Sequence, residues 1–375
     1  MEESCAIGGL ELTPRKKKVC GIWSLPDSVA LICLAQLSRL DLAAFAIASK
    51  EQRSLVGSLE LWDLRYEMGC SELSLYVLLH IFPEPNPRWF IFHPVQRRLK
   101  PIHSNLNPNP VPEAESAFVF ADWGIFDIGG VIKGERTCHV SFFDCFGHIW
   151  PRLPSMKIAR SRASASLIDD KIYVFGGCTD YGDSSNWAEV FDLRTLTWDF
   201  LYVSTPPQHI RQSVLMRDKE EVYVVDEDGQ TMSFSPSKSL FVANGNAEKT
   251  QEEHLTDWCL FGKHLFCAGK GRRILWCFPY ELDWKEVKGL ENLQSLCGNN
   301  EIINLCPMTH KTIAIFWIVR PHDDDPFILE LWSAEISFSN SKRRGTKAGK
   351  IHWSGAVLSG SYVGFNFLYA HPVIA

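Results

Sequence analysis

Hydrophobic and polar positions alternate regularly along the stretch Ser164–Leu201. Short apolar runs with the two-residue period of β-strands are separated by turn-forming residues. The pattern predicts antiparallel strands at Ala163–Ile168, Lys171–Phe175, Trp187–Phe191 and Thr197–Leu201. Asp169–Asp170 is typical of a tight hairpin turn, and Gly176–Gly177 supplies backbone freedom where the second strand ends. A single sheet of this size leaves its faces uncovered, which indicates that similar units lie elsewhere in the chain.

The same pattern recurs, marked by an aromatic residue that closes a hairpin. Asp144 precedes Trp150 by six residues, and Asp192 precedes Trp198 by the same interval. The closing aromatic residues are Trp150, Trp198, Phe241 and Trp284, with Trp353 as a further candidate. A period of roughly 40–50 residues with four strands per unit is typical of a β-propeller. A generic β-sandwich is the alternative, but it gives no reason for the fixed interval.

Paired glycines mark the end of the second strand in the earlier units. Gly129–Gly130 and Gly176–Gly177 hold this position, whereas Asp226–Glu227 and Ala268–Gly269 occupy it later in the chain. Glycine pairs followed by a tryptophan resemble kelch repeats, and no Trp-Asp dipeptide of the WD type closes a unit. We therefore expect the later units to keep the strand pattern but to have differently shaped loops.

The sequence contains five consecutive units, so a further blade would have to combine segments from both ends. The units cover, roughly, residues 117–154, 163–203, 211–243, 255–288 and 293–357. A propeller closes into a ring because this leaves no bare sheet edge between blades. We therefore predict a composite blade made of Arg88–His93 and the last strands, around Gly364–Ile374. This gives six blades, with five as the alternative. Met68–Phe82 is interpreted as a helical or mixed linker, and Ser104–Ser116 as a loop.

The early segment Ser24–Arg65 has the period of helices instead. Its first helix opens at Leu25–Pro26–Asp27. Its helix-spaced apolar residues are Val29, Ile32, Cys33 and Leu37. A second helix is predicted from Asp41 as N-cap, and a third from Glu51 to Val56 that ends at Gly57. About 40 residues make a small helical bundle, and its apolar content exceeds what one interior needs. Part of it should therefore face a partner.

Composition narrows the possible functions. The 375 residues carry a formal net charge of −6, which gives no electrostatic reason to expect nucleic acid. The 12 cysteines form no C-x-x-C pair, and there is no secretory signal and no apolar run near the ~20 residues that span a bilayer. We therefore expect a reducing compartment, the cytoplasm or the nucleus, and no membrane. Residues 1–22 are expected to be a flexible leader, in which Arg15–Lys18 is a candidate import signal.

These segments resemble a known family. We find a resemblance to the F-box in LPDSVALICLAQLSRLDLAAFAIASKEQRSLVGSLELWDLR, and to kelch repeats in PSMKIARSRASASLIDDKIYVFGG and NWAEVFD. From Ser24 onward the chain is similar to plant F-box/kelch-repeat proteins. The resemblance implies a mainly β protein, with a small all-α F-box domain at residues 23–66, a linker at 67–87 and a kelch-type β-propeller at 88–375.

In that family the F-box binds a Skp-type linker protein, which connects it to a cullin–RING ubiquitin ligase, while the propeller holds the protein to be ubiquitinated. The resemblance thus implies a non-catalytic substrate-recognition subunit; the alternative is a propeller scaffold outside any ubiquitin ligase. The residues that would face the linker protein are Leu25, Pro26, Ile32, Leu37, Leu40 and Leu42, unless they only close a cap against the propeller. The kelch positions with a structural role are Gly129, Gly130, Gly176, Gly177, Trp150, Trp198 and Trp284.

The residue pattern gives little support for an enzyme. The histidines include no H-x-x-x-H or H-E-x-x-H pair, so a zinc site is not expected. No phosphate-binding glycine loop leads from a strand into a helix, no G-x-S-x-G elbow occurs, and no spacing marks a galactose-oxidase-like copper site. We expect neither a cofactor nor a metal.

A substrate protein is expected to contact loops on one face of the propeller. Charge singles out three loops: Thr179–Ser185, which contains Tyr181 and Asp183, then Asp323–Asp325 and Lys342–Lys350. Three arginines precede the first strands of units and are predicted to line the mouth of the channel: Arg160, Arg162 and Arg211. For each of these residues the alternative is an ordinary solvated surface.

Overall fold

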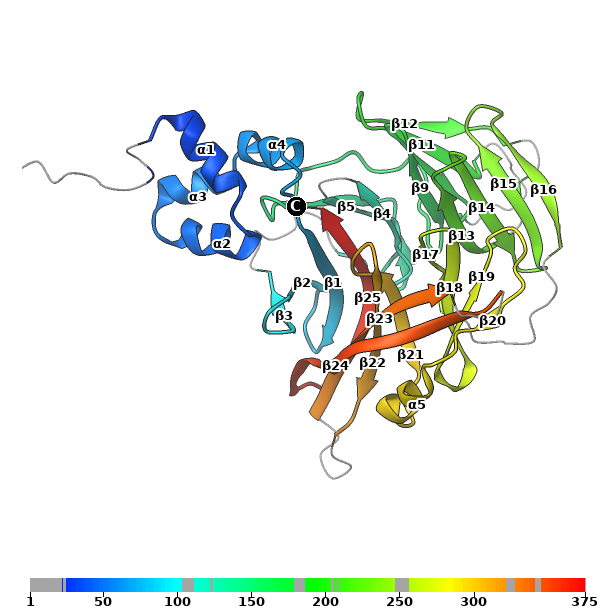
Figure 1. Ribbon diagram of the computed structural model, residues 1–375. Helices are drawn as coiled ribbons and strands as arrows, with labels where there is room; N and C mark the ends of the chain where they lie inside the picture. Colours follow the sequence, from blue (N-terminus) through cyan, green and yellow to red (C-terminus); the bar gives the residue numbers. More distant parts are fainter. Residues whose placement is uncertain are drawn as a thin grey trace, which may run out of the picture. The chain divides into compact units, whose positions relative to one another are not determined.

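The computed structural model describes residues 22, 25–102, 111–121, 124–178, 186–203, 206–207, 209–246, 256–321, 328–340 and 345–374. The chain divides into two units, Met1–Glu72 and Leu73–Ala375. The described part of the first unit is helical, and the second is built mainly from strands (Figure 1).

Serines cap three of the four helices described in the first unit. Its helices are α1 (Asp27–Ala35), α2 (Arg39–Ile47), α3 (Lys50–Val56) and α4 (Leu59–Glu67). Ser38, Ser49 and Ser58 precede α2, α3 and α4, and each hydroxyl accepts a backbone N–H from the first turn of its helix. The prediction that Asp41 caps the second helix is wrong, because Ser38 is the cap and its hydroxyl donates to the Asp41 carboxylate at 2.6 Å. The third predicted helix is confirmed, with Gly57 directly after it.

The helical unit has a small core that one arginine completes. Its buried apolar residues are Ala30, Leu31, Leu34, Ala35, Leu42, Leu61 and Trp62. Arg65 on α4 is fully buried beside them. Its guanidinium donates to the carbonyl oxygens of Ala35 at 2.8 Å, Leu37 at 2.5 Å and Cys70 at 2.8 Å. The carbonyl groups at the end of a helix have no partners within the helix, and Arg65 supplies hydrogen bonds to those at the end of α1. The same guanidinium also binds the segment that follows α4.

The second unit is a six-bladed β-propeller, as predicted. Blade 1 contains β4 (Ala117–Ala121), β5 (Gly124–Ile128) and β8 (Val140–Asp144), with the hairpin β6 (Val131–Ile132) and β7 (Glu135–Arg136) inserted. Blade 2 contains β9 (Ser164–Ile168), β10 (Lys171–Phe175), β11 (Ala188–Asp192) and β12 (Thr197–Leu201). Blade 3 contains β13 (Ile210–Met216), β14 (Glu221–Asp226), β15 (Gln230–Ser235) and β16 (Leu240–Asn246). The four strands expected from the Ser164–Leu201 pattern are therefore confirmed within one residue.

The remaining blades complete the ring. Blade 4 contains β17 (Cys259–Phe261), β18 (His264–Gly269), β19 (Arg273–Cys277) and β20 (Lys285–Glu286), with the 3-10 turn η2 (Lys270–Arg272) before β19. The helix α5 (Glu291–Cys297) leads to blade 5, which contains β21 (Ile302–Pro307), β22 (Thr312–Val319), β23 (Ile328–Asn340) and β24 (Lys347–Ser361). Blade 6 contains β25 (Gly364–Ile374), β1 (Leu73–Phe82), β2 (Arg88–His93) and β3 (Arg98–Pro101).

Blade 6 is the composite blade that the sequence predicts. The last strand, β25, pairs with β1 over its whole length, and β1 pairs with Arg88–His93 (Figure 1). The interpretation of Met68–Phe82 as a helical or mixed linker is wrong for Leu73–Phe82, which forms β1. Seven consecutive residues of β1 are buried, because strands flank it on both sides and neighbouring blades cover both faces. Burial on both faces removes the alternation that would identify a strand.

Six hydrophobic clusters hold the ring together, one between each pair of adjacent blades. The interface of blades 1 and 2 joins Phe142 to Phe191, and the interface of blades 6 and 1 joins Trp89 to Phe143, whose rings stack at 5.3 Å. The other four interfaces have equivalent clusters. Because the last interface leads back to the first blade, the ring has no exposed seam between blades.

The closing aromatic residues pack against the preceding blade. Trp198 of blade 2 is buried in the cluster shared with blade 1, and its Nε1 donates to the carbonyl of Pro154 at 2.9 Å. Phe241, Trp150 and Trp284 take equivalent places in their own interfaces. Trp353 differs, since it lies near Phe92 of the following blade at 6.3 Å. The repeated aromatic is therefore a contact between blades.

Candidate functional site

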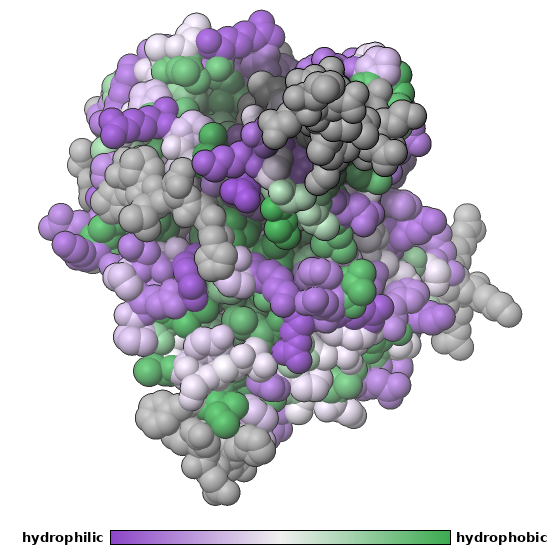
Figure 2. All heavy atoms as spheres, turned by 90° about the vertical axis from the view of Figure 1, so that its left-hand side faces the viewer, coloured by the Kyte–Doolittle hydropathy of each residue, from purple (hydrophilic) through white to green (hydrophobic). Residues whose placement is uncertain are grey.

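One side of α1 exposes apolar side chains that the helical core does not use. Leu25, Val29 and Ile32 are 40%, 40% and 43% exposed, while the opposite side of the helix buries Ala30 and Leu34. Cys33 is exposed as well. Val29, Ile32 and Cys33 lie at i, i+3 and i+4 on one side of α1, and Leu25 is exposed two residues before the helix begins. Figure 2 shows hydrophobic residues interspersed among hydrophilic ones on the face that it draws. We call Leu25, Val29, Ile32 and Cys33 the α1 stripe.

The other residues expected to face a linker protein have different surroundings. Pro26 is exposed directly before α1, and Leu40 is 37% exposed on α2. Leu37 is partly buried, and its carbonyl is bound by Arg65. Leu42 is only 1% exposed, so its expected role as a direct contact is corrected: it belongs to the core of the helical unit. Val29 was not among the predicted contacts, although its position between Leu25 and Ile32 could have indicated it.

The arginines expected at the channel mouth fall into different environments. Arg160 is fully buried and forms an ion pair with the buried Glu189, so the prediction that it meets a substrate is wrong. Its remaining donors bind the carbonyls of Gly176, Asn186 and Trp187. Arg162 is on the surface and pairs with Glu115, from Nη2 to Oε1, at 2.6 Å. Arg211 is exposed, at the point where the register of β13 against β14 shifts.

The charged loops are only partly within the described residues. Tyr181 and Asp183, with the rest of Thr179–Ser185, and also Asp323–Asp325, lie outside them. In the described part of Lys342–Lys350, Lys350 is exposed, but Lys347 is buried with its Nζ 5.0 Å from the centre of the Trp276 ring. Burial lowers the pKa of Lys347.

Among the described residues of the second unit, one buried carboxyl group has an unsatisfied oxygen. Asp127 on β5 is 6% exposed, and its Oδ1 has no hydrogen-bond partner. Burial raises the pKa of Asp127 to about 7, although a hydrogen bond with Ser116 acts in the opposite direction. Within the described ranges, no three metal-ligating side chains gather at one place.

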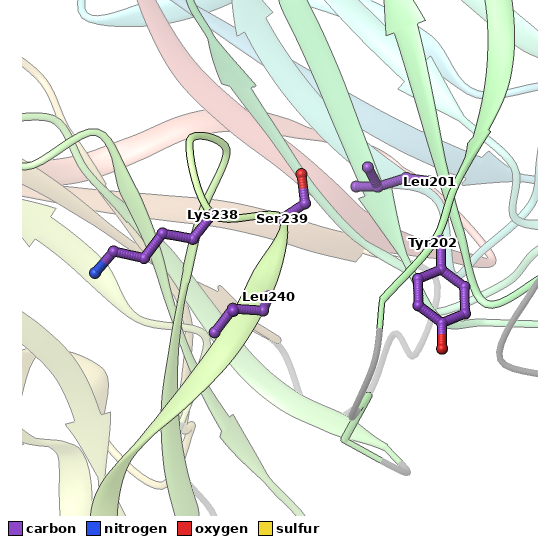
Figure 3. A pocket seen from close by; sticks show the side chains of 5 residues that line it. All are labelled: Leu201, Tyr202, Lys238, Ser239 and Leu240. Atoms are coloured by element: carbon purple, nitrogen blue, oxygen red, sulfur yellow. The ribbon is translucent and has the colours of Figure 1, made fainter.

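A second surface feature lies on the outer rim of the propeller. A cleft of about 460 Å³ is lined by Leu201, Tyr202, Lys238, Ser239 and Leu240 (Figure 3). Its walls come from the end of β12 in blade 2 and the hairpin between β15 and β16 in blade 3. The sequence did not single out these residues. The only available signal was the apolar series Phe200–Leu201–Tyr202, which continues past the end of an outer strand.

The comparisons with known proteins agree on one family. A family model described as FKB95, Kelch-repeats domain, matches residues 89–358. F-box/kelch-repeat protein At4g39580 of Arabidopsis thaliana is 30% identical, with 89% of each chain aligned. F-box/kelch-repeat protein At4g39550 of the same plant is 29% identical over 90% of each chain. F-box/kelch-repeat protein At4g39560 is 41% identical over 48% of this chain and 67% of its own length. The chain belongs to the F-box/kelch-repeat family.

Membership of the F-box/kelch-repeat family confirms the resemblance seen in the sequence. The structure shows how blade 3 closes its turn without the glycine pair. In blade 3, Asp226 ends β14, and its Oδ1 accepts the backbone N–H of Gln230 at 2.8 Å, with Gly229 at a φ of 81° in the turn. A side-chain hydrogen bond thus closes a turn shorter than the one that follows Gly177.

None of the helices over the described residues has the length and apolar content needed to cross a bilayer.

Proposed function

We propose that this chain is the substrate-recognition subunit of a Skp–cullin–F-box ubiquitin ligase, with no catalytic activity of its own. The helical unit binds a Skp-type linker protein, and the propeller binds the protein to be ubiquitinated. The chain then acts by proximity, because holding both partners raises the effective concentration of the target near the ubiquitin-charged enzyme. Such an adaptor would work in the cytoplasm or the nucleus.

The observation that carries this proposal is the α1 stripe. Leu25, Val29 and Ile32 stay exposed although the core of the unit already has its own apolar residues. Burying apolar area that a small unit leaves exposed is the usual source of affinity when an apolar helix face binds in a groove. A few such anchors carry most of the binding energy. Leu40 and Pro26, also exposed, add to the same proposed contact.

The test is a binding measurement between the full chain and a Skp-type linker protein. We expect Leu25→Ala and Ile32→Ala each to weaken binding by roughly tenfold, since each removes about 1.5 kcal/mol of apolar burial. The matched control is Val95→Ala in the propeller, where the side chain is 79% exposed. Thermal unfolding of each variant should stay unchanged, because the substituted side chains are outside both cores.

Two outcomes would contradict the proposal. If the wild-type chain does not bind the linker protein, the protein is better explained as a propeller scaffold outside any ubiquitin ligase. If binding is unchanged in a Leu25→Ala/Ile32→Ala double variant, the linker protein uses another surface and the role given to the α1 stripe is wrong.

A further inference from the structure

The rim cleft between blades 2 and 3 has two free strand edges beside it. β12 is the last strand of its sheet and β16 is the last strand of the next, so each has one side without a strand partner among the described residues. Unpaired edges offer backbone N–H and C=O groups that an added extended segment can bind. Figure 3 shows Leu201 and Tyr202 on one wall and the side chains of the β15–β16 hairpin on the other.

The walls of the cleft rest on a well-packed core. Phe241 of β16 is buried against Phe175 of β10 at 5.3 Å and against Trp187 at 5.6 Å. Leu201, which lines the cleft, packs against the hydrophobic cluster that blades 2 and 3 share. A binding site on strands held in this way is preorganised, so little ordering is required when a ligand enters.

The cleft exposes an aromatic side chain that the described fold leaves largely uncovered. Tyr202, which lines the cleft, is 66% exposed. The volume of about 460 Å³ lies within the range of natural ligand sites, about 300–1,000 Å³. An apolar group on a partner could therefore bury area between Leu201, Tyr202 and Leu240.

One of the five residues that line the cleft, Lys238, carries a positive charge, and none of them is acidic. Lys238 is exposed and forms no ion pair with any described residue. By contrast, the ammonium group of Lys157, which lies near the Phe200 ring of blade 2, already pairs with a carboxylate, since its Nζ is 3.2 Å from Oδ1 of Asp199. The flexible stem of Lys238 allows its ammonium group to reach a carboxylate at the cleft. The Tyr202 hydroxyl is a further hydrogen-bonding group there.

We propose that the rim cleft binds an extended segment of a partner protein in which an acidic side chain lies next to an apolar one. The apolar side chain packs between Leu201, Tyr202 and Leu240, and the carboxylate pairs with Lys238. This inference rests on the proposed function, since it names the chemistry of the substrate segment that the adaptor would hold. It places that contact on the outer edge of the propeller, away from the channel mouth.

The test uses the full chain and a phage-displayed library of random linear peptides. We expect the wild type to enrich peptides with Asp or Glu beside an apolar residue, and the charge-reversed variant Lys238→Glu to enrich Lys or Arg at the same place. A synthetic copy of an enriched peptide, measured by fluorescence anisotropy, should bind Tyr202→Ala at least tenfold more weakly. The matched control is Arg162→Glu, a charge reversal on the same propeller, which should keep the wild-type preference.

The proposal is overturned if no acidic–apolar peptide is enriched, or if enriched peptides bind Lys238→Glu and Tyr202→Ala as tightly as the wild type. The same variants are also tested with the Skp-type linker protein, which they should bind normally. If no acidic–apolar peptide is enriched but the linker protein still binds, only the proposal for the rim cleft is rejected. Failure of linker binding in the wild type would reject the adaptor function instead.

Discussion

Arg160 and Glu189 form an ion pair that is completely buried in the propeller. Nη2 of Arg160 lies 3.0 Å from Oε1 of Glu189, and neither side chain is exposed. The carboxylate also accepts the backbone N–H groups of Lys157 at 2.7 Å and Ile158 at 3.1 Å. The pair therefore attaches the segment that leads into β9 to the strand β11, across the sheet of blade 2.

Removing one partner of this pair should destabilise the propeller strongly. Arg160→Met leaves the Glu189 carboxylate buried without its counter-charge, which typically costs about 3–5 kcal/mol. We expect a corresponding fall in the free energy of unfolding, measured by chemical denaturation followed by tryptophan fluorescence. Arg162→Met is the control: Arg162 forms a surface pair with Glu115, so its loss should cost only about 0–1 kcal/mol. Equal effects of the two substitutions would contradict this account.

The four strands of blade 2 could be predicted because each is short and bounded by clear turns. The first strand of the composite blade could not, since Leu73–Phe82 is buried on both faces and has no alternation. Arg160 was predicted to lie at the surface because a charged residue before a strand is usually exposed. Its burial depends on the ion pair with Glu189, a tertiary contact that the local sequence does not reveal.

In the helical unit, too, some features follow from the local sequence, whereas others depend on how the helices pack. The exposure of Val29 and Ile32 agrees with the helical spacing of the sequence, and Leu25 is exposed just before the helix begins. Leu42 has the same apolar character, and only the packing of α2 on its neighbours decides that it faces inward. The rim cleft requires two blades to be neighbours, which no local pattern contains.

The stability of the propeller should depend on the protonation of Asp127. Its folded pKa of about 7 lies above the value of about 3.9 expected in the unfolded chain, so the folded state binds more protons between these values. Stability from this group is therefore fully present below about pH 4 and decreases, by up to about 4 kcal/mol, as the pH rises to about 7.

Asp127→Asn tests this pH dependence. The amide has nearly the same shape but carries no charge, so the variant should be more stable than the wild type at pH 8 and close to it at pH 4. The measurement is the unfolding midpoint of both proteins across this range. Parallel profiles for the two proteins would show that Asp127 does not titrate in the folded state near neutral pH.

Arg65 should be required for linker binding without touching the partner. Arg65→Lys cannot span the carbonyls of Ala35, Leu37 and Cys70, because an ammonium lacks the planar fork of a guanidinium. We expect the helical unit to lose about 2–3 kcal/mol of stability and linker binding to fall with it. The control is Arg53→Lys on α3, where the arginine is exposed. An Arg65→Lys variant that binds normally would show that the guanidinium is dispensable.

The adjacent glycines of blade 2 should respond differently to the same substitution. Gly176 and Gly177 have φ values of 69° and 72°, a region that costs other residues about 1–2 kcal/mol. A Cβ at Gly176 would meet the ring of Trp187 at 3.7 Å, which is an ordinary contact, whereas a Cβ at Gly177 would lie only 2.6 Å from the carbonyl oxygen of Ser161.

The backbone of Ser161 has little room to move away, because its N–H donates to the carbonyl of Gly177 at 3.0 Å. We therefore expect Gly176→Ala to lower the free energy of unfolding by about 1 kcal/mol and Gly177→Ala by clearly more, about 3 kcal/mol, once the steric clash is added to the strain. Denaturant titrations of both variants make the comparison. If Gly176→Ala proves as damaging as Gly177→Ala, positive φ alone explains the glycine pair and the close approach of Ser161 contributes nothing.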